Sequence, residues 1–268
     1  MSLSAERMAI ANRAIWQTFE KSSIAWQAIP HWDTGDPGQV LVRNDVTVTM
    51  RRHRGRGPLG GTPIRPRGRQ VLFRVTLAQA MAAAPDALLA SVIPRTVRLA
   101  SRFDRAVLRA LRGPAVTAGR ARWYRTLPAG AGERTTRREL VAARAVLENQ
   151  GYRAHSCLIA STRYYADLSR FTAATLLTKG PLTAPSVNSV FRASQLSGLM
   201  MMLGRRQEIA HGAGGSASAG EEPVDIAVCV PPSLEVIGEN AAGQIELAVR
   251  VRFATRVKDE RGVVVFHT

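Results

Sequence analysis

The sequence predicts an α+β protein, with enough apolar residues, 46% of 268, to bury a substantial core. Three segments have the three-to-four-residue apolar spacing of helices, and other segments have the two-residue spacing of strands. The run "HSCLIAS" leads directly into the helical pattern "TRYYADLSRF", which indicates a mixed layer of strand and helix. The C-terminal segment 245–253 is the clearest strand, because every second residue there is apolar.

The first predicted element is an amphipathic helix over residues 4–20. Ser4 can cap it, and its apolar stripe consists of Met8, Ala11, Ile15 and Phe19. The glycines and prolines of "IAWQAIPHWDTGDPG" exclude a long helix immediately afterwards.

A long two-stranded excursion is predicted next. Residues 39–50 alternate like a strand, and residues 69–77 look like its returning partner. Between them lies "RRHRGRGPLGGTPIRPRGR", which has no acidic residue. Its seven arginines are Arg51, Arg52, Arg54, Arg56, Arg65, Arg67 and Arg69. This segment could contact a neighbouring subunit, contact nucleic acid, or form a solvated loop.

Two further helices are predicted. One lies near 94–112, with Pro94 in its first turn and Gly113 at its end. Its arginines recur every three or four residues and form one row, here called the arginine stripe: Arg95, Arg98, Arg102, Arg105, Arg109 and Arg112. The other helix lies at 137–150, with a capping box from Thr136 and Glu139 and with Gly151 at its end.

The end of the chain reads as a hairpin. The strand at 245–253 leads to the turn "KDERG" and then to "VVVF", so we expect two adjacent strands with one buried face. The preceding segment "HGAGGSASAGEE" has the composition of a flexible loop.

The charge of the chain restricts its partners. Its formal net charge is +17, and almost all of the positive charge is arginine. Arginine suits phosphates and interfaces better than lysine does, although a coding bias toward arginine would give the same composition. Cys157 and Cys229 read as buried free thiols, and the chain has neither a membrane-length apolar run nor a secretion-signal pattern. These features predict a cytoplasmic protein without a membrane partner.

No catalytic residues, metal ligands or cofactor site emerge from the motifs. The triplet Asp33-Thr34-Gly35 occurs in aspartic proteases, but that chemistry needs two carboxylates, and a capped turn explains one copy better. His31, Asp33 and Asp36 are too few for a metal centre. We therefore expect a structural or binding protein and not an enzyme.

The order of the elements resembles that of the encapsulins, which are nanocompartment shell proteins with the capsid fold of tailed phages (the Hong Kong 97 type). "ANRAIWQTFE" resembles the N-terminal helix of that family, and "GQVLVRND" to "VLFRVTL" resembles its extended E-loop. "ASRFDRAVLRALRG" is similar to the end of the spine helix, and "AHSCLIASTRYYADL" to the strand and helix of the A-domain. "GQIELAVRVRFATRVKDERGVVVF" is similar to the closing strand and hairpin of the P-domain.

The resemblance implies a phage capsid-like fold with five regions. These are an N-terminal helix and arm (1–37), an E-loop excursion (38–77), a P-domain part with the spine helix (78–115), an A-domain (116–238), and a closing P-domain strand and hairpin (239–268). It also gives the excursion a role, because E-loops of such shells reach over neighbouring subunits. The seven arginines of the excursion would then contact the adjacent protomer.

The resemblance also implies partners. The chain would associate with itself, most simply as a sixty-subunit icosahedral shell, and would enclose a cargo protein. Cargo peptides of the family bind near the N-terminal helix, where Ile15, Trp16 and Phe19 are candidates, although core packing is the alternative. The five-fold pore would be lined by Lys179, Gly180, Pro181, Leu182 and Thr183. Such a shell carries on the order of a thousand positive charges, so nucleic acid or acidic cargo inside would offset them.

Two other functions fit the same residues. A phage or prophage major capsid protein that packages DNA would share the fold, and its neighbouring genes would identify it. A basic nucleic-acid-binding protein without a shell would form small oligomers instead of hollow particles.

Overall fold

The structure is a computed structural model that describes residues 3–44, 63–82, 84–117, 124–128, 130–174, 186–210, 212, 214 and 222–267. Helices and strands both form large parts of it, which confirms the α+β class. The helices are α1 (Ala5–Ser22), α2 (Ile24–Ala28), α3 (Leu77–Met81), α4 (Asp86–Thr117), α5 (Glu133–Asn149), α6 (Thr162–Ala174) and the 3₁₀ turn η1 (Glu260–Gly262). The strands are β1 (His31–Asp33), β2 (Arg67–Thr76), β3 (Tyr124–Thr126), β4 (Ala154–Ala160), β5 (Val187–Arg192), β6 (Leu199–Arg205), β7 (Val224–Glu239), β8 (Gln244–Val257) and β9 (Val263–His267).

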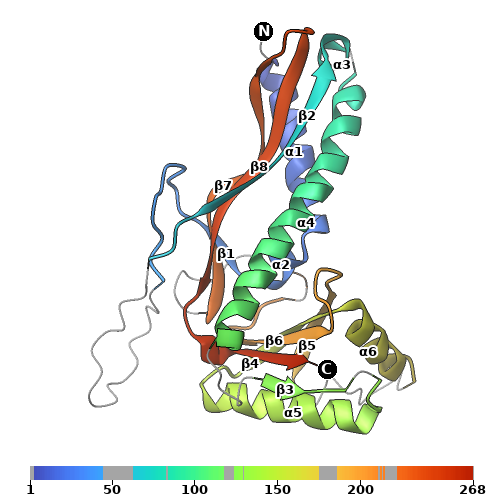
Figure 1. Cartoon of the computed structure of the whole chain (residues 1–268), viewed down its shortest axis with the longest axis vertical. Helices are drawn as coiled ribbons and strands as arrows, with labels where there is room; N and C mark the ends of the chain where they lie inside the picture. Colours follow the sequence, from blue (N-terminus) through green and yellow to red (C-terminus); the bar gives the residue numbers. More distant parts are fainter. Residues whose placement is uncertain are drawn as a thin grey trace.

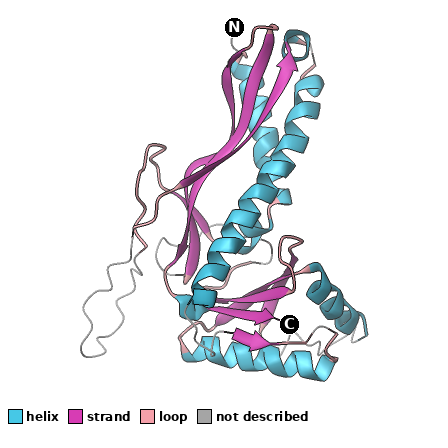
Figure 2. Cartoon of the chain, viewed as in Figure 1, coloured by secondary structure: helices cyan, strands magenta, loops and turns pink. Residues whose placement is uncertain are grey.

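The strands form two sheets in different parts of an elongated chain (Figure 1). The four-stranded sheet has the order β1-β7-β8-β2, and its long strands run beside α4 along the longest axis. The five-stranded sheet has the order β3-β9-β6-β4-β5 and lies at one end, with α5 and α6 beside it (Figure 2).

The four-stranded sheet buries one face against α1 and α4. Every second residue of β8 from Ile245 to Phe253 is buried, as the alternation predicts. Phe103 of α4 connects the layers, because its ring centroid lies 4.4 Å from that of Phe253 and 5.2 Å from that of Phe19 in α1. These contacts join the first helix, the long helix and the last long strand in one core.

The five-stranded sheet is buried on both faces. Cys157, Ile159 and Met201 belong to the same core as α1 and α4, whereas Leu158 and Met200 pack in a second core with residues of α5 and α6. Burial on both faces explains why β4, β6 and β9 are almost continuous apolar runs without alternation.

The first helix is confirmed, and the long helix is longer than predicted. The Ser4 hydroxyl accepts a hydrogen bond from the Arg7 backbone N–H, and Ala11, Ile15 and Phe19 are buried. The predicted start of α4 near Pro94 and its predicted end at Gly113 are both wrong, because the helix begins at Asp86 and continues to Thr117. Pro94 is exposed on the helix surface, so water can bind the carbonyl group that loses its helical partner.

The predicted start of α5 is also wrong. The helix begins at Glu133 after Gly132, whereas Thr136 is buried inside it and forms no capping box. Its end is as predicted. Gly151 has φ +89°, a left-handed conformation, and its backbone N–H donates to the Glu148 carbonyl.

Two predicted strand pairs are wrong. Residues 67–76 pair with β8 along their whole length, whereas in the described part of 39–50 one bridge joins Val42 to Ile64. The predicted C-terminal hairpin does not form, because β9 pairs with β6 and β3 in the five-stranded sheet. The residues of β9 are apolar on both faces of the strand. The five-stranded sheet is buried on both faces, so it accommodates them. The strand 224–239, within the expected A-domain range, lies in the four-stranded sheet beside β8.

Candidate assembly and binding surfaces

The root of the predicted E-loop, residues 37–44 and 63–66, leaves the side of the four-stranded sheet (Figure 1). Two backbone hydrogen bonds of 2.8 and 2.9 Å between Val42 and Ile64 join its two strands. The side chain of Asn44 donates to the Val257 carbonyl at 3.1 Å. The guanidinium of Arg252 donates to the carbonyls of Pro37 and Gln39 at 2.5 and 2.8 Å. Arginine side chains of β8 therefore fix where the excursion leaves the sheet.

A buried ion cluster lies behind this root. Asp225 of β7 accepts two hydrogen bonds from Arg256, at 2.6 and 2.5 Å, and one from Lys258 at 2.9 Å. Arg256 also donates to the Arg43 carbonyl at 2.9 Å and lies 4.8 Å from the centroid of the Trp32 ring. Burial lowers the pKa of Lys258, and the charge of Asp225 opposes that shift. The acid within the apolar run "VDIAVCV" is the signal in the sequence that could have indicated this cluster.

Three of the seven arginines of the excursion lie within the described residues. Arg65 and Arg67 are exposed, and Arg69 is half-buried and donates to the adjacent Gly68 carbonyl at 3.1 Å. None of these three forms an ion pair within the residues that the structure describes. Arg51, Arg52, Arg54 and Arg56 lie outside the described residues.

The arginine stripe lies on the surface of α4. Arg98, Arg102, Arg105, Arg109 and Arg112 are exposed, whereas Arg95 is half-buried with its guanidinium 5.6 Å from the Phe73 ring centroid. Arg102 donates to the Gln70 carbonyl of the edge strand β2 at 2.7 Å. No acid in the described parts of the chain forms an ion pair with the stripe.

Arginines on the outer face of the four-stranded sheet form ion pairs, unlike those of the arginine stripe. Arg74 of β2 pairs with Glu246 of β8 at 2.9 Å, and Arg250 of β8 pairs with Glu235 of β7 at 2.6 Å. Opposite charges on neighbouring strands thus compensate each other on that face. Among the described residues, the arginine stripe on α4 therefore has more positive charge without a paired acid than the outer face of the sheet has.

The three candidate cargo contacts on α1 do not share one environment. Ile15 and Phe19 are wholly buried in the core of the protomer, so core packing accounts for them. Trp16 is 42% exposed, and its ring meets that of Trp26 edge-on with centroids 5.6 Å apart. Of the three candidates, Trp16 alone offers surface to a ligand.

A buried carboxylate joins α2 to α4. Asp104 accepts hydrogen bonds from the Ser23 hydroxyl at 2.6 Å and from the backbone N–H groups of Ile24 and Ala25 at 3.1 and 3.0 Å. It therefore supplies acceptors to the N-terminal end of α2. Burial raises its pKa to about 6, against the opposing effect of these three donors.

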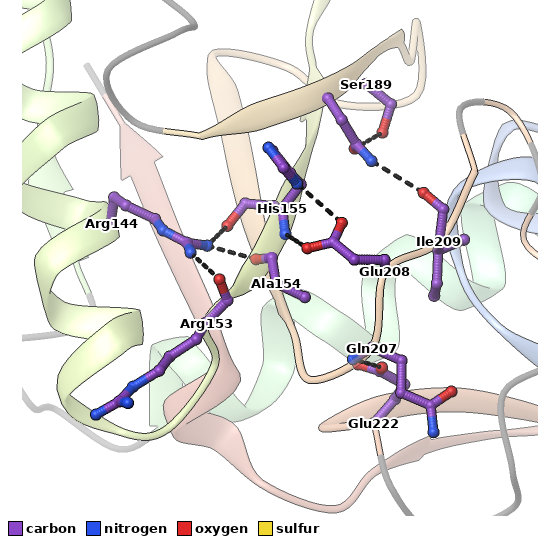
Figure 3. A network of polar contacts seen from close by, with 11 residues as sticks. Arg144, Arg153, Ala154, His155, Ser189, Gln207, Glu208, Ile209 and Glu222 are labelled. Carbon is purple, nitrogen blue, oxygen red and sulfur yellow. Dashed lines mark hydrogen bonds and ion pairs between the residues drawn. The ribbon is translucent and has the colours of Figure 1, made fainter.

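A polar network fixes the segment after β6 (Figure 3). Arg144 of α5 is buried, and it donates to the carbonyls of Arg153 and Ala154 at 2.6 and 2.7 Å. His155 Nδ1 lies 2.8 Å from the Glu208 carboxylate. Arg144 occupies the apolar stripe of its helix, and a cation at such a position signals buried partners.

Glu222 anchors the other end of this segment. Its carboxylate accepts hydrogen bonds from the backbone N–H of Gln207 at 3.0 Å and of Arg206 at 3.1 and 3.2 Å (Figure 3). Burial raises the pKa of Glu222, and the hydrogen bond from Gln207 opposes this shift. Both networks tie backbone segments together, which is a structural role.

The remaining candidates from the sequence are the Asp-Thr-Gly triplet, a metal centre, a membrane helix and the pore residues. Asp33 accepts a hydrogen bond from the Gly35 N–H at 2.8 Å and Gly35 has φ +71°, so the Asp-Thr-Gly triplet forms a capped turn. Within the described ranges, no group of three His, Cys, Asp or Glu residues could hold a metal ion. The described helices also include none long and apolar enough to cross a membrane. The predicted pore residues Lys179, Gly180, Pro181, Leu182 and Thr183 lie outside the described residues.

Comparison with known proteins identifies the fold. No protein-family model and no curated protein matches the chain. A virus-like particle from Pyrococcus furiosus superposes with a TM-score of 0.71 at 12% sequence identity, over 98% of this chain and 100% of that chain. The holo-SrpI encapsulin complex from Synechococcus elongatus gives 0.58 at 9% identity, over 89% and 84% of the two chains. The procapsid of satellite phage P4 gives 0.56 at 11% identity, over 100% and 91%. The chain has the capsid-like fold of encapsulins and phage capsids.

Proposed function

We propose that copies of this chain assemble into a closed icosahedral shell, an encapsulin-type nanocompartment that encloses a cargo protein. The observation that carries the proposal is the extent of the fold likeness, which spans 98% of this chain and the whole chain of a virus-like particle. A protein that shared only one domain with shell proteins would not match over its full length. The proposed role of the chain is structural and not catalytic.

Exposed apolar side chains at the loop root support assembly. Val40 is 66% exposed and Leu41 is 47% exposed, on a segment that projects from the side of the sheet. Arg252 and Arg256 hold the backbone of this segment in place by hydrogen bonds to its carbonyls. A neighbouring protomer that covers Val40 and Leu41 would therefore meet them in a fixed position, which lowers the entropy cost of association.

The outer sheet face offers a second apolar area. Leu72 of β2 is 62% exposed, and Ile237 of β7 is 50% exposed. Arg74 and Arg250 on the same face already form ion pairs within the protomer. In the proposed shell these surfaces, and the arginines Arg65, Arg67 and Arg69, lie at contacts between protomers.

The proposed cargo contact is Trp16. A half-exposed tryptophan on a helix surface can bury a large apolar area against a peptide. The proposed compartment is cytoplasmic, which the unpaired buried thiols of Cys157 and Cys229 support.

Electron microscopy of the purified protein, with light scattering after size-exclusion chromatography, tests the assembly. We expect uniform hollow particles. The double variant Val40→Glu/Leu41→Glu places charges where the neighbouring protomer would bury them, so we expect folded protomers or small oligomers with an unchanged circular dichroism spectrum. The double variant Val40→Thr/Leu41→Met retains shape and should still form particles. A wild-type protein that stays monomeric at micromolar concentration would disprove the shell.

A phage capsid protein that packages DNA is the second candidate, because the phage P4 procapsid has a comparable likeness to this chain. The genes beside this one separate the two functions. A cargo enzyme gene supports the nanocompartment, and portal or terminase genes support the capsid.

A further inference from the structure

We propose that the exposed arginines of the α4 stripe (Arg98, Arg102, Arg105, Arg109 and Arg112) form a binding surface for the phosphate backbone of nucleic acid. The inference goes beyond the proposed enclosure of a cargo protein. It rests on the spacing, the exposure and the lack of compensating charge of these side chains.

The stripe is straight and regular. At about 1.5 Å of rise per residue, Arg98 and Arg112 are about 21 Å apart along the helix. At 3.6 residues per turn, the five side chains leave the helix within an arc of roughly 80°. Their spacing of about 5 Å is comparable to that of charges on a nucleic-acid strand, which occur about every 3.4 Å along the duplex axis.

The charge on this surface is not compensated within the described chain. The stretch from residue 87 to residue 132 has one acid, Asp104, and that carboxylate is 1% exposed and accepts hydrogen bonds from α2. The five arginines therefore present a net positive row to solvent, in contrast to the paired arginines of the outer sheet face. Guanidinium groups bind phosphates through paired hydrogen bonds, so the residue type also suits this ligand.

A second copy of the chain fits the stripe poorly. Every copy has a net charge of +17 and only twenty acidic residues. Seven of these acids already form ion pairs with arginine or lysine within the protomer: Asp167, Asp225, Asp259, Glu139, Glu148, Glu235 and Glu246. Glu208 lies at hydrogen-bond distance from His155. Asp104 and Glu222 are buried. A long polyanion supplies the missing charge more directly than the remaining acids of a sibling chain.

The stripe offers charge without the features of base recognition. Its positions carry arginines only, and Phe103, which lies between Arg102 and Arg105 in the sequence, is buried, so a base cannot stack on it. The expected binding therefore follows the backbone, depends steeply on salt and has no sequence preference.

The test compares salt dependence between matched variants. The variant Arg98→Gln/Arg105→Gln/Arg109→Gln removes three arginines that make no hydrogen bond or ion pair within the described residues. The control Arg134→Gln/Arg137→Gln/Arg153→Gln removes the same charge from exposed side chains elsewhere. All three proteins are freed of cellular nucleic acid with nuclease and high salt. Fluorescence anisotropy then measures the affinity for a labelled 20-base-pair duplex and a 20-nucleotide single strand at several NaCl concentrations.

The expected result is a smaller salt slope in the stripe variant. Each lost phosphate contact lowers the slope by about 0.9 for a duplex or about 0.7 for a single strand, so three lost contacts lower it by about 2 to 3. Between 50 and 200 mM NaCl, five stripe contacts contribute about a 500-fold loss of duplex affinity, and two contribute about a 12-fold loss. The control should retain the wild-type slope.

Three results would overturn the proposal. One is an equal slope in the wild-type protein and the stripe variant. Another is an equal reduction in the control, which would show that net charge acts without a defined site. The third is displacement of the oligonucleotide by polyglutamate at equal charge concentration, which would show that an acidic polypeptide binds equally well. Particle formation is measured in the same samples, so a failure of shell assembly is distinguished from a failure of binding.

Discussion

Asp104 provides a sharp test of how the interior of this protein is organised. Two opposing effects act on its carboxyl group. Burial disfavours the charged form, whereas the hydroxyl of Ser23 and the backbone N–H groups of Ile24 and Ala25 favour it. Burial prevails, and the pKa rises to about 6 from an ordinary value of about 3.9.

A raised pKa makes the contribution of Asp104 to stability depend on pH. Below pH 3.9 the group is protonated in both states, and the folded protein has the full stabilisation. As the pH rises toward 6, the unfolded chain releases its proton first, so the stabilisation is lost. Linkage over about two pKa units gives roughly 2 kcal/mol more stability at pH 4.5 than at pH 7.5 from this group alone.

The variant Asp104→Asn removes the titration and keeps part of the hydrogen bonding. An amide oxygen in place of Oδ1 can still accept from Ser23 and Ala25, while the amide nitrogen cannot accept from Ile24. We expect a cost of about 1 kcal/mol at pH 7.5, from one lost hydrogen bond, and about 3 kcal/mol at pH 4.5. The additional 2 kcal/mol corresponds to a difference in melting temperature of roughly 4–8 °C for a chain of this size.

Thermal unfolding followed by tryptophan fluorescence measures this effect, because Trp26 lies in α2, whose first turn Asp104 caps. Wild type and variant are compared at equal protein concentration at both pH values. The variant Glu6→Gln removes the charge of an exposed acid of α1 and serves as the control. A cost of Asp104→Asn that is equal at both pH values, or greater at pH 7.5, would show that the three donors outweigh burial and would refute this reasoning.

Three further predictions concern the loop root, the turn before β9 and α1. Asp225→Asn removes the counter-charge that the buried cations Arg256 and Lys258 share, so we expect a loss of about 3–5 kcal/mol in urea unfolding, partly restored by adding Lys258→Met. Gly262→Ala places a Cβ against Cβ of Pro223 and should lower the melting temperature. Gly113→Ala should raise it slightly, because among the described residues no atom outside its own stretch of helix lies within 4 Å of the new Cβ. Acrylamide should quench the fluorescence of Trp16 in empty particles and less so in particles purified with cargo. The variant Trp16→Phe should abolish this difference. Equal quenching in both kinds of particle would argue against Trp16 as the cargo contact.

The elements that the sequence predicts well are those whose residues meet one layer of neighbours. Ser4 and the apolar stripe from Ala11 to Phe19 define α1, because a cap and a single buried face are both local patterns. The alternation in β8 predicts the strand and its buried face for the same reason. The same periodicity separates Trp16 from Ile15, because successive residues lie about 100° apart around a helix, and the exposure of Trp16 agrees with its place beside the stripe.

Strand partners are not local properties, and the sequence predicts them less well. The short sequence distance between β8 and β9 favours a hairpin. However, Val263 to Phe266 are apolar on both faces, so they are better buried in the five-stranded sheet, where β9 pairs with β6. Likewise, β2 pairs with β8, which lies about 170 positions later in the chain, as Arg74 opposite Glu246 illustrates. The ion cluster around Asp225 shares this long-range character, because Arg256 joins Asp225 of β7 to the Arg43 carbonyl of the loop root.

The distribution of satisfied and unsatisfied groups links the two proposals. Inside the protomer, the buried charged side chains of Asp104, Arg144 and Asp225 each have several hydrogen-bond partners. At the surface, Val40 and Leu72 leave apolar area in water, and the α4 stripe leaves positive charge without acids. Apolar area can be buried by further copies of the same chain, but positive charge cannot be neutralised by them, because each copy adds to it. In the proposed closed particle, small counterions or an anionic partner offset this charge, and nucleic acid along α4 would do so while leaving the protein contacts to the loop root and the sheet face.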